Sequence, residues 1–119
     1  MDSPINFLDL PKGVDVNFQD NLGNTILHTT VKNNDLTTTR YLRHYNANFN
    51  IQNFEGNTPL HIACKNHNLE LVEFIYRYGG DRYILNKERK TPFDYLSGIE
   101  LSYMNDIYDK LKVFSKKSD

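Results

Sequence analysis

Between residues 55 and 80, the apolar positions form two stripes with helical spacing. The first stripe is Leu60, Ala63 and Cys64, at positions i, i+3 and i+4. Thr58 is a good N-cap for this helix, and Pro59 suits its first turn, where a missing N–H costs nothing. A second stripe follows over residues 69–78, formed by Leu71, Val72, Phe74, Ile75 and Tyr78. The pattern therefore predicts two short helices in succession.

Residues that accept a left-handed backbone conformation lie at the ends of these predicted helices. His67, and Asn34 one unit earlier, lie where the first helix of each pair must end, and we predict a left-handed conformation for both. Gly79 closes the second helix, as do Gly13 and Asn46 at the equivalent positions. The following residues are rich in Gly and Asn and predict a projecting hairpin loop.

The whole pattern recurs every 33 residues. Gly23 aligns with Gly56, Thr25 with Thr58, and His28 with His61, and a third copy begins at residue 86. A unit of this size cannot bury its apolar faces alone, so the copies are expected to stack.

The segment Thr58-Pro59-Leu60-His61-Ile62-Ala63, with its period of 33, resembles the ankyrin repeat. The resemblance implies an all-α solenoid of stacked helix-turn-helix units with hairpin loops. It covers residues 1–114 as a single domain: a partial capping repeat (1–19), two full repeats (20–52 and 53–85) and a degenerate C-terminal cap (86–114). Residues 115–119 are expected to form a flexible tail.

The outer units depart from the repeat pattern. The first full unit lacks the Pro and Ala, and Thr37 to Thr39 lower its helix propensity unless their hydroxyls bond back to the backbone. In the last unit we expect a second helix from about Leu101 to Phe114, with Met104, Ile107, Tyr108 and Leu111 on one face. At the other end, apolar residues are expected to cover the open face: Ile5, Phe7, Leu8 and Leu10.

Charge and cysteine content narrow the function classes. The 14 Lys and Arg residues against 15 Asp and Glu residues give a net charge of −1, a poor basis for binding nucleic acid or an anionic membrane. One cysteine excludes an intrachain disulfide, and the chain has neither a signal-peptide pattern nor a membrane-length apolar run. We expect a monomer in the cytoplasm or nucleus. The chain is rich in Asn, Lys, Ile and Tyr, whose codons are AT-rich, and this composition is typical of some viruses and intracellular pathogens. The expected compartment therefore includes the cytoplasm or nucleus of a host cell.

The motif His61-x-x-Cys64-x-x-His67 has a spacing that a metal site could use. A zinc ion needs four ligands, or three and a water, and the sequence supplies no further partners. The repeat explains His61 better, because His28 occupies the same slot one unit earlier. We therefore expect a structural role for His61, a buried Cys64, no catalytic residues and no metal or other cofactor.

The resemblance implies that another protein binds to the hairpin tips and the inner face of the first helices. We selected exposed candidates at positions that the repeat leaves variable, and we expect Leu22 and Phe54 to occupy equivalent hairpin positions. The predicted protein-binding residues are Leu22, Asn24, Lys32, Phe54, Glu55, Asn57, Lys65, Lys87 and Lys90.

Three further hypotheses remain open. The chain is a viral or pathogen mimic of a host ankyrin inhibitor of the IκB type, a structural subunit docked through its N-terminal face, or a substrate of an asparaginyl hydroxylase. For the last, the resemblance indicates Asn17 and Asn50, and Leu42 lies eight residues before Asn50.

Overall fold

The computed structural model describes residues 13–117, with side chains as far as Lys112. These residues form helices and loops without a β-strand, which confirms the predicted all-α class. The elements are α1 (Ile26–Lys32), α2 (Leu36–Leu42), η2 (Arg43–Tyr45), α3 (Pro59–Lys65), α4 (Leu69–Arg77), η3 (Pro92–Tyr95) and α5 (Gly98–Lys117). No helix in this range is long and apolar enough to cross a membrane.

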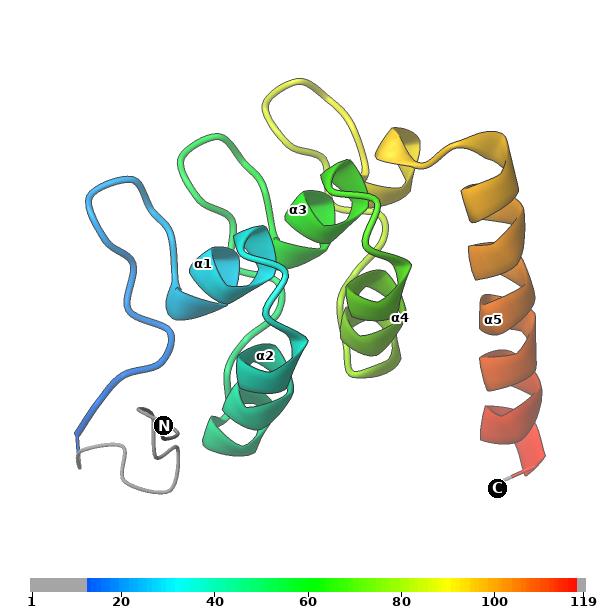
Figure 1. Ribbon diagram of the computed structural model, residues 1–119, viewed down its shortest axis with the longest axis horizontal. Coiled ribbons are helices and arrows are strands. Elements are labelled where there is room, and N and C mark those ends of the chain that lie inside the picture. Colours follow the sequence, from blue (N-terminus) through cyan, green and yellow to red (C-terminus); the bar gives the residue numbers. More distant parts are fainter. Residues whose placement is uncertain (1–12, 118–119) are drawn as a thin grey trace.

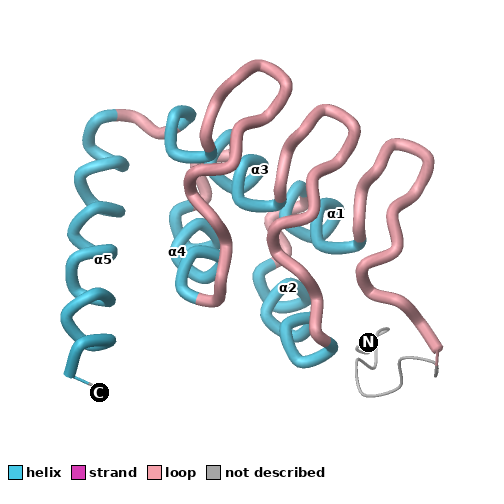
Figure 2. The backbone as a smooth tube through the Cα atoms, turned by 180° about the vertical axis from the view of Figure 1, so that it is seen from behind, coloured by secondary structure: helices cyan, strands magenta, loops and turns pink. Residues whose placement is uncertain are grey.

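The helices form two rows, and three loops project beyond them (Figure 1). One row holds α1, α3 and the short turn η3, and the other holds α2, α4 and α5. The view from behind shows the same order of loops and helices (Figure 2). We call the loops fingers 1, 2 and 3, formed by residues 15–24, 48–57 and 81–90. The repeats thus lie side by side, as the period predicts.

The ends of α1 and α3 follow from local sequence. Thr25 and Thr58 are N-caps, and each forms a capping box with the histidine three residues later. After each helix the chain turns through a left-handed residue, Asn34 with φ 58° and His67 with φ 56°. These values confirm the predicted turn positions.

The core lies between the two rows and is centred on α3 and α4. Leu60, Ala63 and Cys64 are fully buried, as are Leu71, Val72 and Ile75 on α4. The first predicted stripe therefore faces the interior, where the hydrophobic effect stabilises the stack. The second does so only in part, because Phe74 is half-buried and Tyr78 is 42% exposed at the end of α4.

Two threonines of the first full unit, Thr30 and Thr39, satisfy their hydroxyls inside this core. Thr39 Oγ1 donates to the carbonyl of Asp35 at 2.8 Å, and it lies 2.8 Å from Thr30 Oγ1. The predicted back-bonding to the helix is confirmed for Thr39, and it explains how α2 tolerates residues of low helix propensity.

The last unit differs from the sequence expectation in two ways. Its first helix is reduced to the single 3₁₀ turn η3, because Leu96 (ψ 147°) already has extended backbone. Its second helix, α5, begins at Gly98 instead of about Leu101 and runs to Lys117, beyond the expected boundary at residue 114. Met104 is fully buried, as the predicted apolar face requires.

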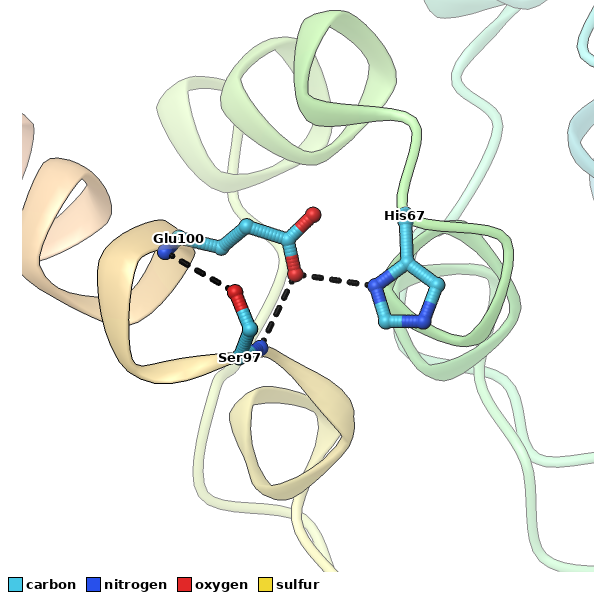
Figure 3. Close-up of polar contacts among 3 residues, drawn as sticks. All are labelled: His67, Ser97 and Glu100. Carbon is cyan, nitrogen blue, oxygen red and sulfur yellow. Dashed lines mark hydrogen bonds and ion pairs between the residues drawn. The ribbon is translucent and has the colours of Figure 1, made fainter.

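A capping box and a neighbouring histidine hold the start of α5. The Ser97 N–H donates to Glu100 Oε1 at 2.9 Å, and the Glu100 N–H donates to Ser97 Oγ at 3.3 Å. His67 Nδ1 donates to the same carboxylate oxygen at 2.8 Å (Figure 3). These hydrogen bonds lower the pKa of Glu100, the backbone bond from Ser97 most strongly. The left-handed turn after α3 is thereby joined to the C-terminal cap.

Arg82 joins finger 3 to the same cap. Its guanidinium carbon lies 4.3 Å from the Phe93 ring centroid and 5.7 Å from that of Tyr108, and one nitrogen donates to Asn105 Oδ1 at 3.3 Å. The corresponding apolar residues proposed for the N-terminal end, Ile5, Phe7, Leu8 and Leu10, lie outside the described residues.

Candidate binding surface

The two repeat histidines are structural bridges between neighbouring units. In the first unit the Thr25 N–H donates to His28 Nδ1 at 3.0 Å, while His28 Nε2 donates to the carbonyl of Asn57 at 2.8 Å. His61 repeats this arrangement with Thr58 (3.0 Å) and the carbonyl of Lys90 (2.9 Å). Because Nδ1 accepts a backbone N–H, each ring must be the neutral Nε2–H tautomer.

These histidines predict an acid sensitivity of the fold. Burial lowers the pKa of both His28 and His61 below the ordinary value of 6.5. Below pH 6.5 the unfolded chain then binds more protons than the folded chain, so the free energy of unfolding falls as pH falls. We expect a lower urea midpoint at pH 5.5 than at pH 7.5. An equal midpoint at the two pH values would contradict this assignment.

The bonds of His61 leave neither ring nitrogen for a metal. Cys64 is fully buried, and burial raises the pKa of its thiol far above neutral pH. Within residues 13–117, no group of three or more His, Cys, Asp or Glu side chains is placed to hold a metal ion. The histidines and the cysteine thus belong to the framework of the stack.

A groove on the inner face gathers five of the predicted binding residues. It has a volume of about 430 Å³ and lies between α1, α3 and finger 2. Its lining includes Asn24, Lys32, Glu55, Asn57 and Lys65. The structure therefore brings together candidates that are up to 41 positions apart in the sequence (residues 24 and 65).

The groove has exposed, unpaired positive charge. Lys32 and Lys65 end α1 and α3 at equivalent positions, and neither forms an ion pair with a carboxylate among the described residues. Lys65 Nζ lies 5.3 Å from the ring centroid of Tyr95, and Lys90 Nζ lies 5.7 Å from the same centroid. Lys87 and Lys90 are both exposed on finger 3.

The expected equivalence of Leu22 and Phe54 is wrong by one residue. At the 33-residue offset, Leu22 corresponds to Glu55, and the Phe54 N–H donates to the carbonyl of Leu22 at 3.1 Å. A Cβ on Gly23 would approach the Phe54 ring within 2.6 Å, so this ring covers the preceding finger. It nevertheless remains 59% exposed, and Leu22 is 63% exposed. Both side chains are therefore available to a partner.

Asn57 is a different case, because its side chain is buried and not exposed as a binding residue requires. Its carbonyl accepts the bond from His28, and its Oδ1 accepts from Asn86 Nδ2 at 2.8 Å. Asn24, at the equivalent position one unit earlier, is half-buried, and its Oδ1 accepts from Asn53 Nδ2 at 2.9 Å. These amides order the fingers, and we remove the side chain of Asn57 from the candidate surface.

Asn17 and Asn50 join their fingers to the next unit, since each Oδ1 accepts a backbone N–H at the start of the next finger, from Asn48 and Asp81 respectively. Asn17 Nδ2 donates to the carbonyl of Asn46 at 3.2 Å, and Asn50 Nδ2 donates to that of Gly79 at 3.0 Å. Both side chains are half-buried. Their hydroxylation stays a prediction.

Several exposed apolar side chains were missed by the sequence analysis. Phe18 is 69% exposed, Tyr83 68%, Leu85 52% and Ile99 84%. Tyr83 and Leu85 could have been identified from the sequence, because they replace the Asn and Gln of the two earlier units. Phe18 could not have been identified in this way, since the equivalent positions in the other fingers are also apolar, Ile51 and Ile84.

Stacked pairs of short helices with projecting fingers define a helical repeat protein. The family model for ankyrin repeats matches residues 3–92 in three copies, and the chain therefore belongs to the ankyrin-repeat family. The match ends at Pro92, within η3, where the last unit departs from the repeat pattern. Ankyrin repeats generally mediate protein binding and are typically non-catalytic. No curated protein matches the chain significantly.

Proposed function

We propose that this protein binds another protein through the inner-face groove and the adjoining finger tips. The observation that carries the proposal is the groove itself, which collects residues from two helices and two fingers of successive repeats. Its mixed lining of amide, lysine and carboxylate groups suits a polypeptide surface, which offers hydrogen-bond donors and acceptors throughout.

The charges of the groove favour a partner with carboxylates. Lys32 and Lys65 project from equivalent helix ends into the same groove, and Glu55 is the acidic residue in its lining. Complementary charges of this kind increase the association rate and select partners more than they increase affinity. Affinity then comes from apolar contact, for which Phe54 and Leu22 provide exposed side chains on the two fingers that contribute residues to the groove.

A site-directed crosslinking experiment tests this function. A photoreactive benzoylphenylalanine replaces Lys65 in one sample and Lys110 on α5 in the matched control, because both residues are exposed lysines. In lysate of cells that express the protein, we expect a defined covalent adduct from position 65 and not from position 110. Adding Lys32→Glu and Phe54→Ala to the position-65 sample lowers the adduct yield about ten-fold, as expected from losing contacts of about 1–2 kcal/mol.

The proposal fails if positions 65 and 110 capture the same proteins at equal yield. It also fails if the adduct from position 65 is unaffected by Lys32→Glu and Phe54→Ala together. Circular dichroism of each variant separates a loss of binding from a loss of folding, since all the substituted side chains are exposed.

A further inference from the structure

A second groove, which we call the outer groove, lies between α2 and α4. These two helices lie side by side in the row away from the inner face (Figures 1 and 2). The groove has a volume of about 440 Å³. Its lining extends along both helices, from Leu36 and Glu70 near their starts to Arg43 and Tyr78 at their ends. It shares no lining residue with the inner-face groove, so it is a separate surface.

Two arginines of the first full unit reach across the outer groove to aromatic rings of the next unit. The guanidinium carbon of Arg43 lies 4.1 Å from the ring centroid of Tyr78, and that of Arg40 lies 6.0 Å from the ring centroid of Phe74. The two rings are neighbours, with centroids 4.9 Å apart. A cation–π contact restrains a long arginine side chain and leaves its N–H groups as donors for another partner.

Neither of these arginines has an acidic partner. Among the described residues, Arg40 and Arg43 form no hydrogen bond through their side chains and no ion pair. Arg77 in the same lining differs, because its Nη2 donates to Glu73 Oε2 at 2.7 Å. Glu70 is the other acidic residue of the lining, and it lies at the opposite end of the groove, in the first turn of α4. Two like charges over adjacent rings repel each other, and a bound anionic group relieves this repulsion.

The remaining lining of the outer groove is apolar. Leu36 and Phe74 are half-buried, and Tyr78 is 42% exposed. A groove that follows two neighbouring helices along their length suits a third helix, whose side chains on one face enter it together. The occupant that fits therefore carries acidic groups next to apolar ones on one helix face.

We propose that the outer groove binds an acidic amphipathic helix of a partner protein. Two carboxylates one turn apart on that helix accept hydrogen bonds from Arg40 and Arg43, which are themselves one turn apart at positions i and i+3. Each guanidinium bonds its carboxylate through two parallel N–H donors. An apolar side chain of the partner contacts Leu36 and Phe74. Because the outer groove is separate from the inner-face groove, this inference does not depend on the function proposed above.

Fluorescence anisotropy with short helical peptides tests this inference on the full chain. The acidic probe is a labelled amphipathic peptide with leucines and two glutamates one turn apart on the same face. Two comparison probes replace both glutamates, one with glutamine and the other with phosphoserine. Each probe is titrated with the wild-type chain, with Arg40→Gln and Arg43→Gln combined, with Arg43→Lys, and with Arg89→Gln. The last is the matched control, because Arg89 is an exposed arginine on finger 3, outside the groove.

We expect the acidic probe to bind the wild-type chain at least ten-fold more tightly than the glutamine probe. The combined arginine variant should weaken binding of the acidic probe about ten-fold or more, and Arg89→Gln should leave it unchanged. Arg43→Lys should weaken it several-fold, since lysine keeps the charge and loses the paired donors. Circular dichroism and urea unfolding confirm that each variant remains folded, because the substituted side chains are all exposed.

The inference is overturned if the acidic and glutamine probes bind equally or if neither binds. An equal loss of binding in Arg89→Gln and in the combined variant also overturns it, because attraction to any arginine would then suffice. Binding that Arg43→Lys leaves unchanged does the same, since a point charge would be enough. If the phosphoserine probe alone binds, the groove recognises phosphate and not carboxylate. Sedimentation velocity of the chain alone examines a second copy as occupant: self-association that the combined variant abolishes would replace the partner helix by that copy.

Discussion

Gly56→Ala should destabilise the protein by about 3 kcal/mol, although it adds only one methyl group. Gly56 has φ +81°, a conformation that costs an L-residue about 1–2 kcal/mol. The new Cβ would also lie 2.8 Å from the Lys87 nitrogen and 2.9 Å from the Asn86 Cα. Both are backbone atoms, so finger 3 must move as a whole, and the Lys87 N–H then loses its bond to the carbonyl of Glu55.

Gly13→Ala provides the matched control. Gly13 has nearly the same backbone angle, φ +84°, but a Cβ there meets nothing within 4 Å. Its destabilisation should therefore be limited to the conformational cost of about 1–2 kcal/mol. Urea unfolding of both variants measures the difference. If the two free energies of unfolding are equal, close contact between the fingers does not contribute to stability.

Local signals explain why most of the fold was predictable. A helix begins where Thr is followed three residues later by His, and it ends where Asn34 or His67 takes the left-handed conformation; both depend on residues close in sequence. The period of 33 then requires that equivalent residues have equivalent neighbours. This is why a structural role for His28 and His61 was predictable before any distance was known.

The last unit was less predictable because two local preferences compete there. Thr91 and Asp94 form a capping box that begins a helix, but Ser97 caps a second helix only six residues after Thr91. An N-cap requires non-helical backbone, so the first helix is confined to the turn η3. The repeat pattern does not predict this competition, since the earlier units have no N-cap residue at the position equivalent to Ser97.

The binding surface was predictable only as far as it depends on repeat register. Lys32 and Lys65 lie in the last turns of α1 and α3, and their exposure follows from the register of each helix. The burial of Asn57 depends on groups 29 residues away in either direction, His28 and Asn86. The exposure of Phe18 similarly depends on what lies against finger 1. Such effects arise from contacts between residues far apart in the sequence, which the repeat pattern does not specify.

The second large effect is expected for His61→Ala, at about 3 kcal/mol of lost stability. His61 is fully buried and joins the N-cap of its own helix to the carbonyl of Lys90 in the next unit. Its removal leaves the buried Thr58 N–H without its acceptor, at a cost of about 1–3 kcal/mol, and opens a cavity beside Tyr95.

His44→Ala is the control for removing an imidazole. His44 is exposed on η2, and its ring contact is with Tyr41 at a centroid distance of 6.2 Å. The control should change the free energy of unfolding by no more than about 0.5 kcal/mol. His61→Ala should also weaken the acid sensitivity predicted above, because one of the two buried rings no longer titrates. A variant that lost stability but kept the full difference between pH 7.5 and pH 5.5 would show that His61 packs in the core without governing the acid response.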